Sequence, residues 1–409
     1  MRERRARAFL RILMFLILQG CLSGGTNPAS KAEERRNVAI PFIIEGFGAG
    51  AVGGYGGAIL TVTNLNNDGP GSLREAVNKP GPRVIRFGVA GIIQLRSDLT
   101  VGEPYVTIDG SDAPQGGITI RDATLIIQTE QVIIRHLRVR PGVGVPDLGN
   151  GDAITVKPEG KHVVLDHVSL SWSTDETLSI YGTDVTVQWS FVTEGLNCTG
   201  HPKDFCHSKG LFLSEPSTRI SVLHTLIAHH VDRNPFIRSG RTDMPNQYQF
   251  VNNIFYDYGD PTVIQTLAPA GTVQLDFVGN FYKRGPKSYG LEILLASRGL
   301  DTFRGTLSLY LLGNISPNRL RETDPENLLL SEGRRRYVAT KRNFSPVSSE
   351  TDAFTAFESV LSKGGAALPC RDAVDRRVAD EVRHGKGQII DRPADVGGWP
   401  SMICENGKK

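Results

Sequence analysis

A loose recurrence of short strand-like segments constrains the fold of this chain more than any other feature. Each copy is rich in β-branched residues and ends in a polar or asparagine turn that leads into a second short strand. The copies return at irregular intervals of about 22 to 35 residues, as in a β-solenoid, where each coil needs only its core-facing strands and insertions go into loops. The copies are "VIIRHLRVRPG" at 132, "VVLDHVSLSW" at 163, "VTVQWSFV" at 185, "ISVLHTLIAHH" at 220, "YQFVNNIFYDYG" at 248, "VQLDFVGNFY" at 273 and "LSLYLLGNIS" at 307.

The turns between paired strands carry a second regularity. Asn253, Asn280 and Asn314 stand at similar places after their strands. Asparagine tolerates left-handed turn geometry and bonds to neighbouring backbone, so these residues predict a ladder running from coil to coil. Glycine is frequent, at 45 residues, and long helical runs are few. The sequence therefore predicts an all-β chain whose parallel coils stack on one another.

Both ends of such a solenoid need a cover. In "GPGSLREAVN", Ser72 precedes Glu75 by three residues, a capping-box pattern that predicts a short helix over the N-terminal end. Two helices are expected on the outside of the solenoid near the C-terminus. Their predicted packing faces are Phe354, Phe357, Val360 and Leu361 in the first and Val374, Val378 and Val382 in the second.

The first 21 residues read as an export segment. A basic start is followed by an apolar run too short to span a bilayer, and then by "LQGC", which resembles a bacterial lipobox ending at Cys21. Lipid attachment at Cys21, a plain signal cut nearby and an uncleaved anchor remain open. The sequence predicts a tether at 22–45, a solenoid at 46–345 and a helical extension at 346–409. We expect an exported protein that is extracellular, periplasmic or held to a membrane by lipid.

Charge argues against nucleic acid as a partner. The chain is +3, and its first 21 residues hold five arginines and one glutamate, or +4, so the rest is near 3 − 4 = −1. A nucleic-acid binder needs a basic mature surface. We expect a monomer without a nucleic-acid partner.

Four cysteines besides Cys21 suit an oxidising compartment. Their positions favour the pairs Cys198–Cys206 and Cys370–Cys404, although four cysteines allow three connectivities and buried reduced thiols are the alternative.

Charged residues in four stretches are candidates for chemistry. Asp152 lies in "NGDAI", Asp175 in "STDE", Lys209 in "CHSKG" and Arg233 in "RNPFIR". In stacked coils these positions come to one side, within reach of one ligand. Carboxylates are calcium ligands and the cations suit an anionic ligand, so a metal ion between protein carboxylates and a substrate carboxylate reconciles both.

At these residues the chain resembles the pectate lyases, family 1 of the polysaccharide lyases. The resemblance rests on "GDAI", "DH", "STDE", "HSKG" and above all "RNPFIR", and it spans about residues 50–400. The stretches "GGYGG…VTNLNNDGPGSLREAV" and "IIDRPADVGGWP" resemble a bacterial branch. The resemblance implies a right-handed parallel β-helix and calcium-assisted β-elimination of polygalacturonate, an acidic polysaccharide.

The same resemblance implies roles for single residues. Arg233 matches the arginine that takes the proton from C5 of the uronate, and Arg238 and Lys209 match cations that bind the substrate carboxylate. Asp152 and Asp175 match Ca²⁺ ligands. From the residues alone, Arg233 reads as an anion binder, because a guanidinium is almost fully protonated in water. A base role requires neighbouring positive charge or burial, and predicts activity that rises toward alkaline pH.

Two positions depart from the family pattern. Ser179 stands where a further acid is common, and Asn150 stands two residues before the first ligand in place of aspartate. Calcium is then held more weakly, mostly through substrate, or by the neighbouring Glu176. The alternatives are a lyase acting on another uronan or on methylated pectin, a β-helix hydrolase, and a non-catalytic binder of acidic glycans.

Structural roles are expected for several other polar residues. Asp166 and His167 are predicted to link adjacent coils, and His230 to be a satisfied solenoid histidine. Arg138 and Arg140 alternate in their strand, which predicts an exposed, salt-linked ladder.

Overall fold

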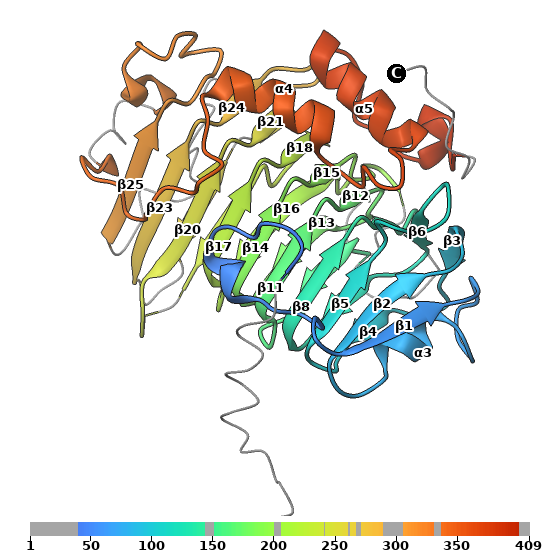
Figure 1. Cartoon of the computed structure of the whole chain (residues 1–409). Helices are drawn as coiled ribbons and strands as arrows, with labels where there is room; N and C mark the ends of the chain where they lie inside the picture. The colour runs from blue at the N-terminus through green and yellow to red at the C-terminus, as the bar shows by residue number, and fades with distance from the viewer. Residues whose placement is uncertain are drawn as a thin grey trace, which may run out of the picture. The chain divides into compact units, whose positions relative to one another are not determined.

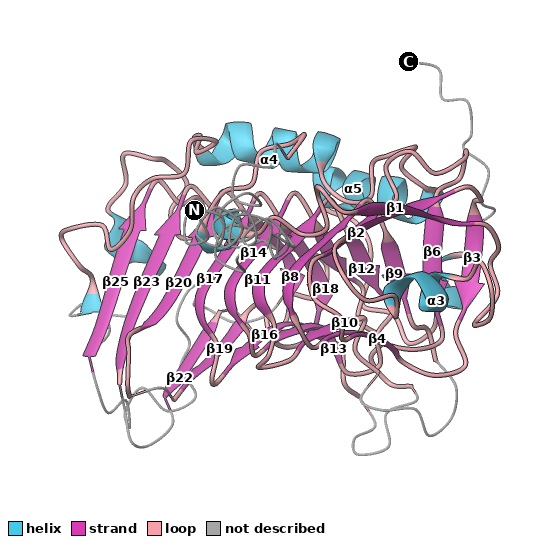
Figure 2. Ribbon diagram, turned by 60° about the horizontal axis from the view of Figure 1, so that its bottom comes forward, coloured by secondary structure: helices cyan, strands magenta, loops and turns pink. Residues whose placement is uncertain are grey.

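Three parallel sheets run side by side through the structure, and successive coils add one strand to each in turn (Figures 1 and 2). The structure is a computed structural model that describes residues 40–143, 151–199, 206–240, 242–260, 262–266, 271–288, 306–330 and 337–400. Within these ranges the architecture is a right-handed parallel β-helix, as the sequence predicts.

Sheet A has 10 strands: β1 (Ala58–Val62), β2 (Arg83–Phe87), β5 (Val106–Asp109), β8 (Glu130–Arg135), β11 (Lys161–Asp166), β14 (Thr183–Gln188), β17 (Thr218–Leu223), β20 (Asn246–Val251), β23 (Thr272–Val278) and β25 (Thr306–Leu312). Sheet B has 8: β3 (Gly91–Gln94), β6 (Ile118–Arg121), β9 (Arg138–Arg140), β12 (Ser169–Ser171), β15 (Phe191–Thr193), β18 (Leu226–His230), β21 (Ile254–Tyr258) and β24 (Phe281–Lys283). Sheet C has 7: β4 (Leu99–Val101), β7 (Leu125–Ile127), β10 (Ile154–Val156), β13 (Glu176–Ile180), β16 (Lys209–Ser214), β19 (Phe236–Ser239) and β22 (Val263–Thr266). These counts refer to the ranges given above.

The interior is built from columns of apolar residues in register. One column in sheet A passes through Leu165, Val187, Val222, Phe250 and Phe277, each paired with the next. All five are fully buried, and the last two stack with ring centroids 4.8 Å apart. Because every strand edge except the outermost is paired, coil stacking buries apolar surface and satisfies backbone hydrogen bonds together.

The predicted asparagine ladder is present at the turn between sheets A and B. The side-chain oxygen of Asn280 accepts from the backbone N–H of Asn253 at 2.9 Å, and that of Asn314 accepts from the N–H of Asn280 at 3.0 Å. Thr225 extends the ladder by donating its backbone N–H to the side chain of Asn253 at 2.9 Å. These buried amides fix the vertical register of successive coils.

Short helices cover the solenoid as the sequence predicts. Helix α3 (Leu73–Val77) begins at Ser72, whose hydroxyl accepts the N–H of Glu75. Helices α4 (Ala353–Lys363) and α5 (Ala373–His384) lie over sheet B (Figure 1). They pack on β15, β18 and β21 with a shared apolar cluster that includes Val360, Leu361, Val378 and Val382. Phe354 is 50% exposed, but its ring packs edge-on against Phe281 of β24 with centroids 5.5 Å apart, and α4 also buries Ala353 and Ala356.

Arg138 and Arg140 were expected on an exposed ladder, and this is wrong, because both are fully buried. They lie on β9, beneath the N-terminus of α5. Arg140 binds Asp372 at 2.5 Å and Asp375 at 2.8 Å, and Arg138 Nε lies 3.3 Å from Asp372. Burial alone would raise the pKa of Asp372, but the charges of Arg140 and then Arg138 outweigh it and hold that pKa well below its usual range.

The segment from residue 40, whose first six residues fall in the predicted tether, lies against the outer face of sheet A. Ile40, Phe42 and Ile44 pack on a cluster that contains Ile133 and Val164. The short 3-10 helix η1 (Phe47–Gly50) follows, and 3-10 helices η3 (Glu326–Leu329) and η5 (Pro393–Val396) occur nearer the C-terminus. The export segment lies outside the described residues. Among the helices that are described, none is both long and apolar enough to cross a membrane.

Candidate active site

Coil stacking gathers the candidate charged residues at one edge of sheet C. Strands β10, β13, β16 and β19 are neighbours, and each candidate lies at or just before the start of one of them. Glu176 pairs in register with Lys209, which forms a further bridge with Asp232, the residue before Arg233. Positions from four coils therefore face one region, which brings together residues spread over more than 80 positions of the sequence.

Asp152 is positioned by the glycine before it. Gly151 has a φ of +72°, and a Cβ there would lie 2.0 Å from the hydroxyl of Thr174 on the next coil. Only glycine allows so close an approach in this backbone conformation. Asp152 is buried, and its Oδ2 accepts the hydroxyl of Thr155 at 2.7 Å. Burial and then the charge of Asp175 raise the pKa of Asp152 to about 7.

A carboxylate cluster forms where β10 and β13 begin. Asp152, Asp175 and Glu176 each offer an oxygen, and these oxygens lie within 4.8 Å of one another. Oδ1 of Asp152 is buried and accepts no hydrogen bond. Three hard oxygen donors, one of them without a hydrogen-bond donor, suit a calcium ion, so these residues fit the metal that the family resemblance implies. Ser179 lies on the same strand with its buried hydroxyl unpartnered, and Asn150 lies outside the described residues.

Lys209 and Arg233 are held by the acids of this cluster. Lys209 Nζ lies 3.6 Å from Asp175 and contacts His207, which is itself 2.7 Å from the same carboxylate oxygen. The guanidinium of Arg233 forms an ion pair with Glu176. The Lys209 side chain is 14% exposed and that of Arg233 is 17% exposed, so each retains a path to a ligand in solvent.

Arg238 lies within strand β19, five residues after Arg233, and on the same face of sheet C. It pairs in register with Ser214, whose hydroxyl accepts its Nε–H at 3.0 Å, and it lies 3.2 Å from Glu215. The ring of Phe212 contacts both arginines, since its centroid lies 4.2 Å from the guanidinium carbon of Arg233 and 5.0 Å from that of Arg238. An aromatic face so placed attracts both cations and fixes their planes. The sequence interpretation missed Phe212 as a site residue, although its place three positions after Lys209 is the available signal.

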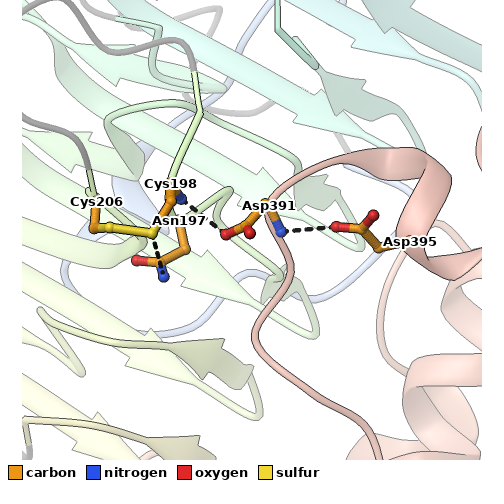
Figure 3. The surroundings of a disulfide bond; sticks show 5 residues. All are labelled: Asn197, Cys198, Cys206, Asp391 and Asp395. Carbon is orange, nitrogen blue, oxygen red and sulfur yellow. Dashed lines mark hydrogen bonds between the residues drawn. A yellow bond between two sulfur atoms is a disulfide. The ribbon is translucent and has the colours of Figure 1, made fainter.

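A disulfide lies three residues before Lys209 in the sequence, and Figure 3 shows its surroundings. Cys198 and Cys206 are bonded, as predicted. The N–H of Cys198 donates to Asp391 at 3.0 Å, and the N–H of His207 donates to the carbonyl of Asn197 at 2.6 Å. The start of β16 is thereby tied to the C-terminal segment. Cys370 is also disulfide-bonded, and its predicted partner, Cys404, lies outside the described residues.

Two other polar groups have structural contacts. Asp166 accepts hydrogen bonds from Gln188 at 2.9 Å and from Arg135 at 3.1 Å, on the strands either side of its own, which suits the predicted link between coils. His230 is fully buried. Its Nδ1 accepts the N–H of Gly195 at 3.2 Å and its Nε2 donates to the carbonyl of Val192 at 3.0 Å. Burial lowers the pKa of His230 to about 4, so it stays neutral.

Comparisons with known proteins place this chain in a family. A curated "Probable pectate lyase C" of Aspergillus terreus is 34% identical over 363 residues, covering 87% of this chain and 80% of the relative. The Aspergillus flavus protein of the same name is 31% identical over 359 residues, with the same coverage. No protein-family model matches the chain.

Solved structures agree on the fold. The cedar pollen allergen jun a 1 aligns with a TM-score of 0.55 and 18% identity, over 84% of this chain and 98% of the allergen. A Bacillus sp. pectate lyase in complex with trigalacturonate aligns with a TM-score of 0.51 and 15% identity, over 79% of this chain and 98% of that one. At these identities the structures show the fold alone, and the family follows from the curated relatives. On this basis the chain belongs to the pectate lyases, a family of polysaccharide lyases.

Proposed function

We propose that the protein cleaves polygalacturonate by calcium-assisted β-elimination, leaving oligogalacturonides with a 4,5-unsaturated end. One observation carries the proposal: a carboxylate cluster that fits calcium adjoins three cations, Lys209, Arg233 and Arg238, on one face of sheet C. The substrate class comes from the names of the relatives, one of which is bound to trigalacturonate. We place the reaction outside the cytoplasm because of the export segment.

The chemistry needs positive charge beside the uronate carboxylate. The proton on C5 is weakly acidic, and its removal adds negative charge to a group that is already negative. Lys209 and Arg238 are assigned to that carboxylate, where their charges stabilise the developing enolate. Calcium held by Asp152, Asp175 and Glu176 would supply further positive charge there.

Arg233 is assigned as the base. It takes the proton from C5, the C5–H electron pair forms the C4–C5 double bond, and the C4–O bond breaks. The leaving oxygen then takes a proton from water, which completes the balance of the step. An arginine base requires that its neutral form be accessible, so the rate is expected to rise toward alkaline pH.

A product assay tests this proposal. The protein is mixed with polygalacturonate at several alkaline pH values, with calcium and then with chelator, and the ultraviolet absorbance of the unsaturated uronate is followed. Arg233→Lys is expected to abolish a calcium-dependent rise. Arg219→Lys, on sheet A and 44% exposed, is the matched control and should keep the rate.

Three outcomes would contradict the proposal in whole or in part. Full activity of the Arg233→Lys variant would remove the base assignment. A folded protein that binds polygalacturonate in calcium without forming product would favour the non-catalytic binder, to which Ser179 in place of an acid lends support. Product from methylated pectin or another uronan alone would change the substrate.

A further inference from the structure

Two acids of the carboxylate cluster, Asp175 and Glu176, each lie beside a cation that is assigned to the substrate. Asp175 lies 3.6 Å from Lys209, and Glu176 forms an ion pair with Arg233. The third acid, Asp152, leaves its Oδ1 without a hydrogen bond. The carboxylate oxygens of Asp175 and Glu176 can therefore bind either these side-chain cations or a metal ion.

This arrangement limits what Arg233 can do while it is paired. A guanidinium that binds a carboxylate is oriented by it and is stabilised in its charged form. Glu176 is 7% exposed and Arg233 17%, so water screens the pair only weakly. The nitrogen of Arg233 that binds Glu176 cannot accept a proton from C5 of a sugar at the same time.

A divalent ion changes the charge balance. With every group ionised, the three carboxylates and the three cations on this face sum to −3 + 3 = 0, and a divalent cation brings this to +2. An anionic sugar is therefore attracted more strongly in the second state. Metal binding therefore favours both the transfer of Glu176 to the ion and the presentation of Arg233 to the substrate.

We propose that Glu176 is shared, pairing with Arg233 in the metal-free protein and with the metal ion in the loaded protein, so that metal binding releases Arg233 toward the substrate. This inference rests on the proposed function for the identity of the metal and the substrate. Because coupling between two ligands is reciprocal, metal and oligogalacturonate each strengthen the binding of the other.

Arg238 supplies the contrast. It carries the same charge on the same face, but its carboxylate partner is Glu215, which lies outside the cluster and is 32% exposed. Removal of Arg238 lowers the positive charge of the face without freeing an acid of the cluster. The Arg238 variant therefore shows whether calcium affinity changes through competition for Glu176 or through the overall charge of the face.

The test is a cycle of metal affinities, measured by calorimetry with calcium alone and checked by terbium luminescence. The proteins are wild type, Arg233→Gln, Glu176→Gln and the double variant. Arg233→Gln is expected to tighten calcium binding by at least about threefold, since a competitor for Glu176 is lost. The same change in the Glu176→Gln background should have an effect of less than about 1.5-fold. Arg238→Gln should leave the affinity within about twofold of wild type.

Three results would overturn the proposal. Equal effects of Arg233→Gln in both backgrounds would mean that charge alone acts, and an equal effect of Arg238→Gln would mean the same. A wild type that binds no calcium would refute the cluster itself. Thermal unfolding in chelator shows which variants are folded, and Arg233→Met replaces any glutamine variant at that position that is not.

These measurements do not use turnover, so the two proposals fail separately. If the effects of Arg233→Gln and Glu176→Gln depend on each other but the protein forms no unsaturated product, the sharing of Glu176 is supported and the lyase activity is refuted. If the two effects are independent in a protein that does form product, the lyase activity is supported and the sharing of Glu176 is refuted. In the coupled case, trigalacturonate should also bind wild type more weakly in chelator, and Glu176→Gln should reduce that difference.

Discussion

Replacement of Arg140 by methionine tests the buried ionic anchor of helix α5. Methionine keeps the aliphatic stem but removes the guanidinium, which binds Asp372 at 2.5 Å, Asp375 at 2.8 Å and Ser171 at 3.0 Å. Asp372 then keeps Arg138, and Asp375 loses a direct partner. Removing one member of a buried ion pair costs about 3–5 kcal/mol, because the remaining charge stays desolvated.

Hydrogen exchange of the α5 amides measures this cost locally. A loss of about 3 kcal/mol in the free energy of opening corresponds to exchange about 100-fold faster. The effect should shrink as pH falls toward 5, because the abandoned carboxylates can then be protonated within the fold. Arg383→Met is the matched control on the same helix, since its pair with Glu358 is 40% and 65% exposed and contributes less than about 1 kcal/mol.

Two results would refute this reasoning. The first is an increase in exchange of less than about fivefold in Arg140→Met, which corresponds to about 1 kcal/mol. The second is an equal increase in Arg383→Met, which would mean that any lost arginine loosens α5. Either result would make the buried arginines packing residues whose charge contributes little to docking.

Three further predictions concern stability. The pKa of His230 is about 4, below the usual 6.5, so its contribution to the free energy of unfolding is fully present above pH 6.5 and falls by about 3 kcal/mol as pH drops toward 4. Denaturant unfolding at several pH values should show this slope, and His230→Gln should flatten it. Replacement of Cys198 and Cys206 by alanine opens a short loop and should lower the free energy of unfolding by about 2–3 kcal/mol, measured without reductant so that the disulfide of Cys370 stays intact in both proteins. Chelator should lower the thermal midpoint of the wild type by about 3–5 °C relative to saturating calcium, and Asp152→Asn should show no such response.

Local sequence patterns were sufficient for the coils. Asn253 and Asn280 are turn residues whose partners lie one coil away, so their spacing alone predicted the ladder. The same holds for Ser72, which caps a helix within its own turn. The candidate acids and cations also came together, because neighbouring coils place equivalent positions side by side.

Contacts between distant segments were beyond the sequence patterns. Alternation in the strand of Arg138 and Arg140 indicated that they share a face, and the structure buries that face under α5. Their acidic partner Asp372 lies more than 230 positions away, and the sequence around the arginines does not indicate this pairing. Glu176 was named only as a neighbour of the metal site, because its pairing with Arg233 depends on which side chains meet across three coils.

The contacts of α5 also bear on the order in which the chain can assemble. Bonds of the asparagine ladder join residues about 27 to 34 positions apart, so a coil can add to the previous one as soon as it has been synthesised. Arg138 and Arg140 must wait for residues 366–375, which follow the last coil strand in the sequence. A growing chain therefore carries two uncovered cationic side chains on the solenoid until that segment has been made. The arrival of α5 then covers them, so the packing of sheet B is completed only after all the coils are in place.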